Sequence, residues 1–309
     1  MPKTQYVKAE IVESPLVKGL EAVFEYELST LPIIDLYQKR YQMDVSRFFQ
    51  EDAIRVYRCP ESGYRFYYPY RMGDSRFYEE LQRFDWYYLP WKWEYEVCLG
   101  LLGPGQKVLE IGCGKGDFIK KAFEDKQANC VGLELNESVR SPLPEVQVFH
   151  QTIEDFSEAH PESFDVVCSF QVLEHIADIR SFLEAAVKTL KSKGILVLCV
   201  PNNASFLRYD PDNILNQPPH HIGLWDETSL RNLEKYFPIQ PQNIFFEPLP
   251  KYHFDYYMTV MVRKSAGKTL AGMLSRALNL GLNRVLHPII QKRADRIRGQ
   301  SILGVYRKL

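Results

Sequence analysis

The stretch Lys107-Val-Leu-Glu-Ile-Gly-Cys-Gly-Lys-Gly-Asp-Phe118 decides the fold of this chain. An apolar strand pattern runs into three glycines at alternate positions, and a helical pattern follows at once. Glycine is needed where the backbone takes a positive φ or lies against a ligand. Strand, glycine turn and helix in this order are typical of a nucleotide-type cofactor site in an α/β sheet.

Two details distinguish this turn from a dinucleotide-binding turn. The glycines 112, 114 and 116 are spaced G-x-G-x-G, whereas the dinucleotide fingerprint is G-x-G-x-x-G. Glu110 precedes the first glycine by two positions, where its carboxylate would repel a pyrophosphate but would suit a cationic ligand. No G-x-x-x-x-G-K-[S/T] pattern occurs, which excludes a phosphate-binding P-loop. The turn therefore resembles the first motif of class I S-adenosyl-L-methionine (SAM)-dependent methyltransferases, whose cofactor carries a sulfonium and an ammonium but no phosphate.

From residue 107 onwards, strand and helix patterns alternate, which predicts a parallel sheet of the α/β class. The resemblance implies a Rossmann-like SAM methyltransferase fold, with a seven-stranded, mostly parallel sheet and an antiparallel last strand beside the sixth. We expect helices over 117–125, 179–190 and 227–236, and strands over 107–111, 130–134, 146–150, 164–170, 194–200, 243–247 and 301–307.

Four regions are expected along the chain. Residues 1–100 form an N-terminal extension with a β-hairpin, 55–59 and 64–68, followed by an aromatic segment that is either a lid or part of the core packing. Residues 101–252 form the SAM-binding core, 253–298 a helical insert and 299–309 the final strand. The hairpin keeps only Cys59 where related methyltransferases carry a two-cysteine zinc knuckle. One cysteine cannot supply a site that needs about four ligands, so we expect a hairpin without metal.

The composition is that of a soluble globular protein. A net charge of −1 argues against an electrostatic nucleic-acid binder. The six cysteines include no C-x-x-C pair, which favours a reducing cytoplasm. The first residues hold no apolar signal region, and no apolar run reaches the length of about 18 residues that a spanning helix needs. We therefore expect a cytoplasmic protein.

The resemblance assigns the cofactor site to four segments. Glu110 faces the ammonium above the glycine turn, and Glu134 accepts the ribose hydroxyls; a surface acid at a strand end is the alternative for Glu134. The loop after the third strand holds the adenine edge, although Thr152 stands where the family usually has an acid, and a plain acidic loop is the alternative. The expected cofactor-binding residues are Glu110, Gly112, Cys113, Gly114, Gly116, Glu134, Leu135, Thr152, Ile153, Glu154, Phe170 and Gln171.

Three histidines are candidates for the catalytic base. His220 and His221 follow two prolines in a loop that covers the substrate pocket in related families, and His175 ends a V-L-E-H sequence. Histidine is well suited to proton transfer near neutral pH, although each of these rings can instead hydrogen-bond its own loop. Together with Glu174 they can converge on a metal, but no ligand spacing requires one. We therefore expect no metal.

These features predict a methyltransferase that modifies a small-molecule or glycan acceptor, with a hydroxyl of a sugar, lipid-linked saccharide or natural product favoured. Residues 170–175 replace the tetrapeptide of enzymes that methylate exocyclic base nitrogens, which argues against adenine methylation. The alternatives are an RNA methyltransferase, a non-catalytic SAM-binding module and an NAD-linked oxidoreductase. Residues 265–298 combine an apolar helical stripe with basic residues. This stripe packs on the core or on a second subunit of a homodimer, or it contacts an anionic membrane.

Overall fold

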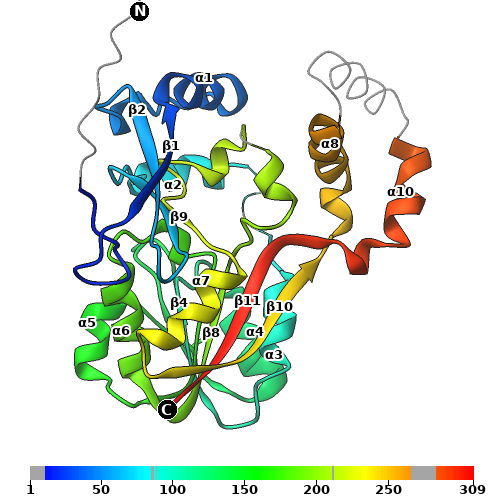
Figure 1. Cartoon of the computed structure of the whole chain (residues 1–309). Helices are drawn as coiled ribbons and strands as arrows, with labels where there is room; N and C mark the ends of the chain where they lie inside the picture. Colours follow the sequence, from blue (N-terminus) through cyan, green and yellow to red (C-terminus); the bar gives the residue numbers. More distant parts are fainter. Residues whose placement is uncertain (1–10, 85–86, 88, 211, 266–282) are drawn as a thin grey trace, which may run out of the picture.

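The computed structural model describes residues 11–84, 87, 89–210, 212–265 and 283–309, and its centre is a seven-stranded sheet (Figure 1). The strands follow the order β10-β11-β8-β7-β4-β5-β6. Strands β4 to β8 pair in parallel, whereas β11 is antiparallel to both β8 and β10. The predicted α/β fold is therefore confirmed. The strands are β4 (Lys107–Ile111), β5 (Asn129–Leu133), β6 (Gln147–Phe149), β7 (Phe164–Phe170), β8 (Leu190–Pro201), β10 (Ile239–Pro248) and β11 (Arg298–Lys308).

Alternation along the strands sends side chains into two separate cores, because successive residues of a strand point to opposite faces. Leu109 and Val167 lie in the core that α5 (Ile153–Ala159) and α6 (Ile179–Thr189) cover, together with α7 (Glu227–Arg231). Val108 and Val166 lie in the opposite core, under α3 (Trp93–Leu99) and α4 (Asp117–Lys126). The sheet is thus covered on both faces (Figure 1), as a parallel sheet requires.

A second, four-stranded sheet is built mainly from the N-terminal region, in the order β1-β2-β3-β9. It contains the predicted hairpin as β2 (Ala53–Arg58) and β3 (Arg65–Tyr68), and the Cys59 sulfur accepts a hydrogen bond from the Ser62 backbone N–H at 3.5 Å. The sequence analysis did not predict β1 (Val23–Ser29) or the two-residue β9 (Gly223–Leu224). Since β9 follows the two loop histidines directly, the small sheet fixes that loop against the core. Helices α1 (Thr30–Tyr41) and α2 (Ser75–Gln82) belong to the same N-terminal region.

Close packing holds β9 in place. Trp225 is fully buried, and its ring centroid lies 4.4 Å from that of Tyr64 in the hairpin. Gly223 sits against the same two side chains, so that a Cβ atom there would lie 2.4 Å from the Tyr64 hydroxyl oxygen. Only glycine fits at this position. The loop of residues 217–225 therefore enters and leaves the core along one fixed path.

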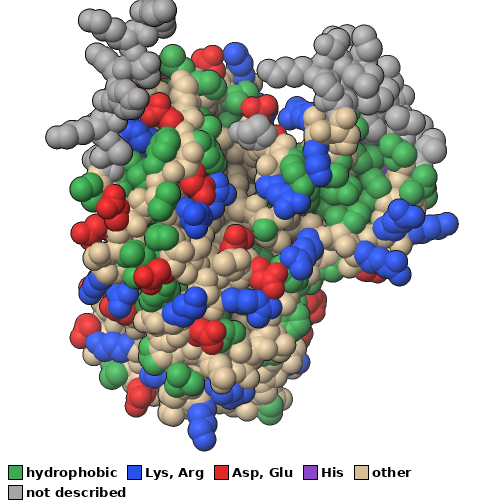
Figure 2. All heavy atoms as spheres, viewed as in Figure 1, with side chains coloured by type: hydrophobic (Ala, Val, Ile, Leu, Met, Phe, Trp, Pro, Cys, Tyr) green, Lys and Arg blue, Asp and Glu red, His purple; other side chains and the backbone are tan. Residues whose placement is uncertain are grey.

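An arm made of α8 (Phe254–Ser265) and α10 (Asn283–Gln291) extends beyond the ends of β10 and β11 (Figure 1). His287 Nε2 lies 2.8 Å from Asp255 Oδ1 and joins the two helices. Figure 2 shows hydrophobic side chains gathered on the arm, with Lys and Arg side chains around them. Most of the predicted apolar stripe, from Leu270 to Leu282, lies outside the described residues. Pro288 lies inside α10, which continues on both sides of it. Among the described residues, no helix is both long and apolar enough to span a membrane.

Candidate active site

The glycine turn follows β4 directly and leads into α4. Gly112 and Gly116 have φ values of +75° and +78°, in the region that favours glycine. A Cβ atom on Gly112 would lie 2.5 Å from Val172 Cγ2, and one on Gly116 would lie 2.8 Å from Pro142 Cγ. Both the conformation and the lack of space therefore require glycine. The turn leaves backbone exposed to a ligand at the carboxyl edge of the sheet, where α/β folds bind cofactors.

Two carboxylates flank the turn. Glu110 is 1% exposed, and its Oε2 atom has no hydrogen-bond partner in the described part of the chain. Burial holds the pKa of Glu110 well above its usual value. Glu134 accepts hydrogen bonds from the backbone N–H groups of Gly114, at 2.9 Å, and Asn136, at 3.0 Å. A carboxylate has about four acceptor sites, so Glu134 can still accept hydroxyl donors.

A cavity of about 360 Å³ opens beside the turn. It is lined by Gln82, Gly114, Lys115, Glu134, Asn136, Ser138, Val139 and Arg140. Leu135, next to Glu134, is 67% exposed and free to contact a ligand. The unpartnered Glu110 oxygen suits an ammonium and Glu134 suits a diol, so the residues present fit SAM. Cys113 is buried in the core beneath the turn.

The segment expected to hold the adenine edge is partly helical. Thr152 caps α5: its Oγ1 accepts from the Asp155 backbone N–H at 3.2 Å and lies 3.1 Å from Asp155 Oδ2. The expected loop therefore ends at Ile153, where α5 begins and whose side chain is buried. Glu154 is half-buried. The Thr152 hydroxyl is already engaged, and the contact of this segment with adenine stays a prediction.

Phe170 and Gln171 follow β7 but point to different surroundings. Phe170 is buried against the rings of Tyr95 and Phe118, with centroids 5.2 and 5.0 Å away. Gln171 has a φ of +58°, which is uncommon for a residue other than glycine. Its Nε2 atom lies 3.4 Å from Glu94 Oε1 and 3.4 Å from Ser301 Oγ. Gln171 thereby lines a second cavity.

This second cavity, of about 490 Å³, lies among the ends of β7, β8, β10 and β11 and under α8. Its lining is rich in polar and aromatic side chains. They include Arg40, Tyr87, Lys92, Glu94, Gln171, Asp210, Asn213, Asn216, His220, His221, Glu247, Tyr252, His253, Tyr256 and Ser301. A cavity of this size suits a small molecule, for which sites of about 300–1,000 Å³ are typical.

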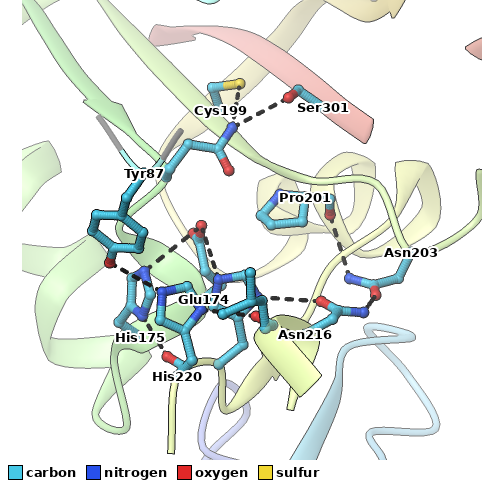
Figure 3. Close-up of polar contacts among 12 residues, drawn as sticks. Tyr87, Glu174, His175, Cys199, Pro201, Asn203, Asn216, His220 and Ser301 are labelled. Carbon is cyan, nitrogen blue, oxygen red and sulfur yellow. Dashed lines mark hydrogen bonds and ion pairs between the residues drawn. The ribbon is translucent and has the colours of Figure 1, made fainter. Parts of the chain in front are cut away.

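The structure brings the three predicted histidines together at this cavity (Figure 3). The ring centroids of His175 and His220 are 5.0 Å apart, those of His175 and His221 are 4.8 Å apart, and those of His220 and His221 are 4.4 Å apart. Burial lowers the pKa of His175 to about 4 and that of His220 to about 3, and it holds the pKa of His221 well below its usual value. These rings are therefore neutral at physiological pH and weak as bases.

Glu174 lies at the centre of the histidine cluster. Its side chain is fully buried, and neither carboxylate oxygen has a hydrogen-bond partner among the described residues. The Nε2 atoms of His175 and His221 each lie 3.9 Å from Oε1 of this carboxylate. Burial raises the pKa of Glu174 to about 8.

The sequence analysis missed several side chains at this site. Tyr78 Oη lies 3.2 Å from His175 Nδ1, and Tyr87 Oη lies 3.0 Å from His220 Nε2. Both tyrosines come from the region around the aromatic segment, whose density of rings was the available signal. Glu247 is 4% exposed, and its Oε2 accepts the backbone N–H groups of Gln300 and Ser301, each at 3.0 Å. Glu247 ends the sixth predicted strand, just as Glu134 ends the second. This position was the sequence signal that could have identified Glu247 as a site residue.

Comparisons with known proteins find a methyltransferase domain in this chain. Residues 88–236 match the family model described as a methyltransferase domain. The chain is 33% identical over 96 residues to a ubiquinone biosynthesis O-methyltransferase from Hahella chejuensis, covering 28% of this chain and 40% of that protein. It is 34% identical over 102 residues to the ubiquinone biosynthesis O-methyltransferase from Pseudomonas syringae pv. tomato. This match covers 29% of this chain and 42% of that protein. The chain thus spans about two fifths of the length of these curated relatives.

Similarity to solved structures is lower. A SAM-dependent methyltransferase from Archaeoglobus fulgidus aligns with a TM-score of 0.46 and 17% sequence identity. The alignment covers 76% of this chain and 100% of that chain.

Glu247→Gln should change the pH dependence of stability in a defined window. Burial, reinforced by the charge of Glu94, raises the pKa of Glu247 to about 7 from an unfolded value of 4.5. Between these values the folded carboxyl keeps a proton that the unfolded chain has lost. The Glu247 carboxyl therefore makes its full contribution to the free energy of unfolding below pH 4.5. This contribution is lost as the pH rises to 7, by up to about 1.4 kcal/mol per pH unit.

Urea unfolding at pH 5, 6 and 7.5 tests this. We expect the free energy of unfolding of the Gln variant, relative to wild type, to rise by about 1–3 kcal/mol across the window, because Gln cannot ionise. A difference that stays constant from pH 5 to 7.5 would contradict the assignment.

Proposed function

Because this chain belongs to the class I SAM-dependent methyltransferases, we propose that it transfers a methyl group from SAM to a hydroxyl of a small-molecule acceptor. The observation that carries this proposal is that two cavities lie beyond the ends of neighbouring strands at one edge of the sheet. The cofactor turn follows β4, and the polar cavity begins at Gln171, which follows the adjacent β7. A donor group held at the turn can therefore face an acceptor held beyond Gln171.

The residues at the turn would hold and orient the cofactor. Glu110 is placed for the ammonium, and Glu134 for the ribose hydroxyls. SAM supplies a methyl group on a sulfonium, already activated for in-line displacement. The protein then has mainly to align the acceptor, and such alignment can contribute about 7–11 kcal/mol.

An oxygen acceptor also has to lose its proton. His220 and His221 line the acceptor cavity, and we propose that one or both of them support acceptor binding or proton removal there. Their low pKa values limit them as free bases, since an efficient base has a pKa near the working pH. Glu247, whose burial raises its pKa to about 7, lines the same cavity and is better matched in this respect.

The lining of the cavity supports a hydroxyl-rich acceptor, such as a sugar or a saccharide carrier. Its lining includes carboxylate, amide and guanidinium side chains, such as those of Asp210, Asn213 and Arg40. Such groups offer both donors and acceptors to several hydroxyls at once. The relatives from Hahella and Pseudomonas are named as O-methyltransferases of ubiquinone biosynthesis, which supports the wider class of small-molecule acceptors.

Glu134→Ala should weaken SAM binding at least tenfold. We expect wild-type affinity in the micromolar range, about −8 kcal/mol, and hydrogen bonds to a charged acceptor contribute roughly 1.5–3 kcal/mol each. Isothermal calorimetry measures both values. Glu137→Ala is the matched control, because Glu137 is an exposed carboxylate three positions along and outside the cavity lining. Equal affinity in wild type and the Glu134 variant would refute the ribose assignment, and tighter binding of NADH than of SAM would refute the family.

His220→Ala should reduce kcat/KM by about 100-fold with an acceptor found by screening, while SAM affinity stays at the wild-type level. The ring contacts the acceptor cavity and not the cofactor turn. Release of S-adenosylhomocysteine with a panel of sugar and phenol acceptors provides the assay. His160→Ala is the control, since His160 stacks on Phe156 away from the cavity. Normal turnover by both this variant and His221→Ala would leave this loop with a structural role only.

We propose further that the arm of α8 and α10 contacts an anionic membrane surface, where a lipid-linked acceptor would be found. Hydrophobic and basic side chains gather on and around the arm (Figure 2). The exposed Ile289 of α10 is followed in the sequence by the exposed Lys292 and Arg293. Each basic residue near such a surface contributes about 1 kcal/mol. Packing against a second subunit of a homodimer is the competing role.

Co-sedimentation with anionic vesicles separates these two roles. We expect binding at low salt, loss of binding at high salt, and weaker binding after Lys292→Glu and Arg293→Glu. Lys18→Glu, an exposed site on the N-terminal segment, is the control. A wild-type protein that stays in the supernatant at low salt would leave the arm with a packing role.

A further inference from the structure

The histidine cluster contains three ligand atoms that face one another with nothing between them (Figure 3). Nε2 of His175 and Nε2 of His221 each lie 3.9 Å from Glu174 Oε1, beyond hydrogen-bond distance. The Glu174 carboxylate is fully buried and unpartnered in the described part of the chain. Whether these nitrogens carry hydrogens or lone pairs decides what the cluster can bind.

The hydrogen-bond network identifies the tautomer of His221. The Pro201 carbonyl can only accept, so the Asn203 amide nitrogen, 3.4 Å away, points to it. The Asn203 oxygen then accepts from the Asn216 nitrogen at 2.6 Å, which turns the Asn216 oxygen toward His221. This oxygen lies 3.2 Å from His221 Nδ1. Nδ1 therefore carries the hydrogen, and Nε2 presents a lone pair to Glu174.

The same reasoning applies to His175. Its Nδ1 atom lies 2.5 Å from the carbonyl oxygen of His220, which accepts and cannot donate. Nδ1 therefore carries the hydrogen here too, and Nε2 again presents a lone pair to Glu174. Two imidazole lone pairs and a carboxyl group converge on one buried point, which is repulsive unless a proton or a cation lies between them.

We propose that Glu174, His175 and His221 bind a divalent transition-metal ion. Metal–nitrogen and metal–oxygen bonds to zinc are about 2.0–2.2 Å long, so one ion can bridge atoms up to about 4.2 Å apart. The observed separations of 3.9 Å fall inside this limit and need to shorten by a few tenths of an ångström for a tetrahedral angle. The other ring nitrogen of each histidine donates to an oxygen, as is usual for metal-binding histidines.

His220 holds the site together without being a ligand. Its Nδ1 lies 2.8 Å from the carbonyl oxygen of Leu215, and its Nε2 lies 3.0 Å from the Tyr87 hydroxyl, so both ring nitrogens are engaged. Its ring stacks on His221, and its carbonyl orients His175. It is a positioning residue for the metal ligands.

The ligand set favours Zn²⁺ or a similar ion over Mg²⁺. Imidazole nitrogens suit zinc, copper, iron and nickel, whereas Mg²⁺ prefers oxygen ligands and retained water. Three protein ligands leave a coordination position open. Because His221 lines the acceptor cavity, that position can face it.

An open coordination position has a chemical use. A metal-bound hydroxyl group loses its proton far more easily than a free one, and that proton can pass to water in the cavity. This role rests on the proposed methyl transfer, whereas metal binding itself does not. The sequence analysis expected no metal, because no ligand spacing in the sequence requires one.

Metal binding by the full-length chain tests the proposal. After removal of metals with EDTA and dialysis, we expect Zn²⁺ to bind at one ion per chain in calorimetry and to raise Tm, while Mg²⁺ at equal concentration does neither. Glu174→Gln and His221→Ala should each weaken Zn²⁺ binding by at least tenfold. His253→Ala is the matched control: His253 lines the same cavity but lies outside the cluster, so affinity should stay at the wild-type level.

A second readout separates loss of a ligand from loss of folding. In EDTA, Glu174→Gln should melt at or above the wild-type temperature, because it removes an unpartnered buried carboxyl; it should then fail to respond to Zn²⁺. SAM affinity should be the same in wild type and in Glu174→Gln, so failure of the metal site and failure of the cofactor assignment are distinguishable. Wild-type protein without stoichiometric Zn²⁺ binding, or a Glu174→Gln variant that binds Zn²⁺ normally, would overturn the proposal.

Discussion

A carboxylate buried without a partner is costly, and the candidate site of this protein is organised around two of them. Desolvation of such a group costs several kcal/mol unless a proton, a cation or hydrogen bonds compensate. Glu110 lies under the glycine turn and Glu174 inside the histidine cluster, and both retain unpartnered oxygens in the described structure. Glu110 suits the ammonium of SAM, and Glu174 suits a metal ion. The two unpartnered groups thus account for the two ligands that the site is proposed to hold.

The rest of the fold keeps these groups in place. Strands β4 and β7 are neighbours in the parallel sheet, so the segments that follow them emerge at the same edge. Glu110 lies near the end of β4, and Glu174 lies just after the end of β7. The loop with His220 and His221 reaches this edge because β9 joins it to the N-terminal sheet and Trp225 packs on Tyr64. The Ile222 backbone N–H donates to the Glu174 carbonyl at 2.8 Å and links the loop to the cluster directly. The N-terminal sheet is therefore part of what shapes the acceptor site.

Much of the core could be predicted from the sequence, because local patterns determine it. The bounds of β4 and β7 are as predicted, since apolar runs ended by turn residues mark buried strands. β8 and β10 begin at 190 and 239, each four residues earlier than expected at 194 and 243, in stretches where polar residues mask the strand pattern. The two-residue β9 has no local signal, because its pairing with β3 is a long-range contact. The tautomer of His221 depends on Asn203 and Asn216. The roles of these two residues appear only once the fold brings them close to His221.

A crystal structure with S-adenosylhomocysteine tests the central claim most directly, namely that the cofactor turn and the histidine-lined cavity form one active site. The account predicts the ligand's amino group at Glu110 and its ribose at Glu134. Its sulfur should face the cavity that begins at Gln171 and contains His220 and His221. A ligand whose sulfur points away from this cavity, or whose ribose lies away from Glu134, would contradict the account.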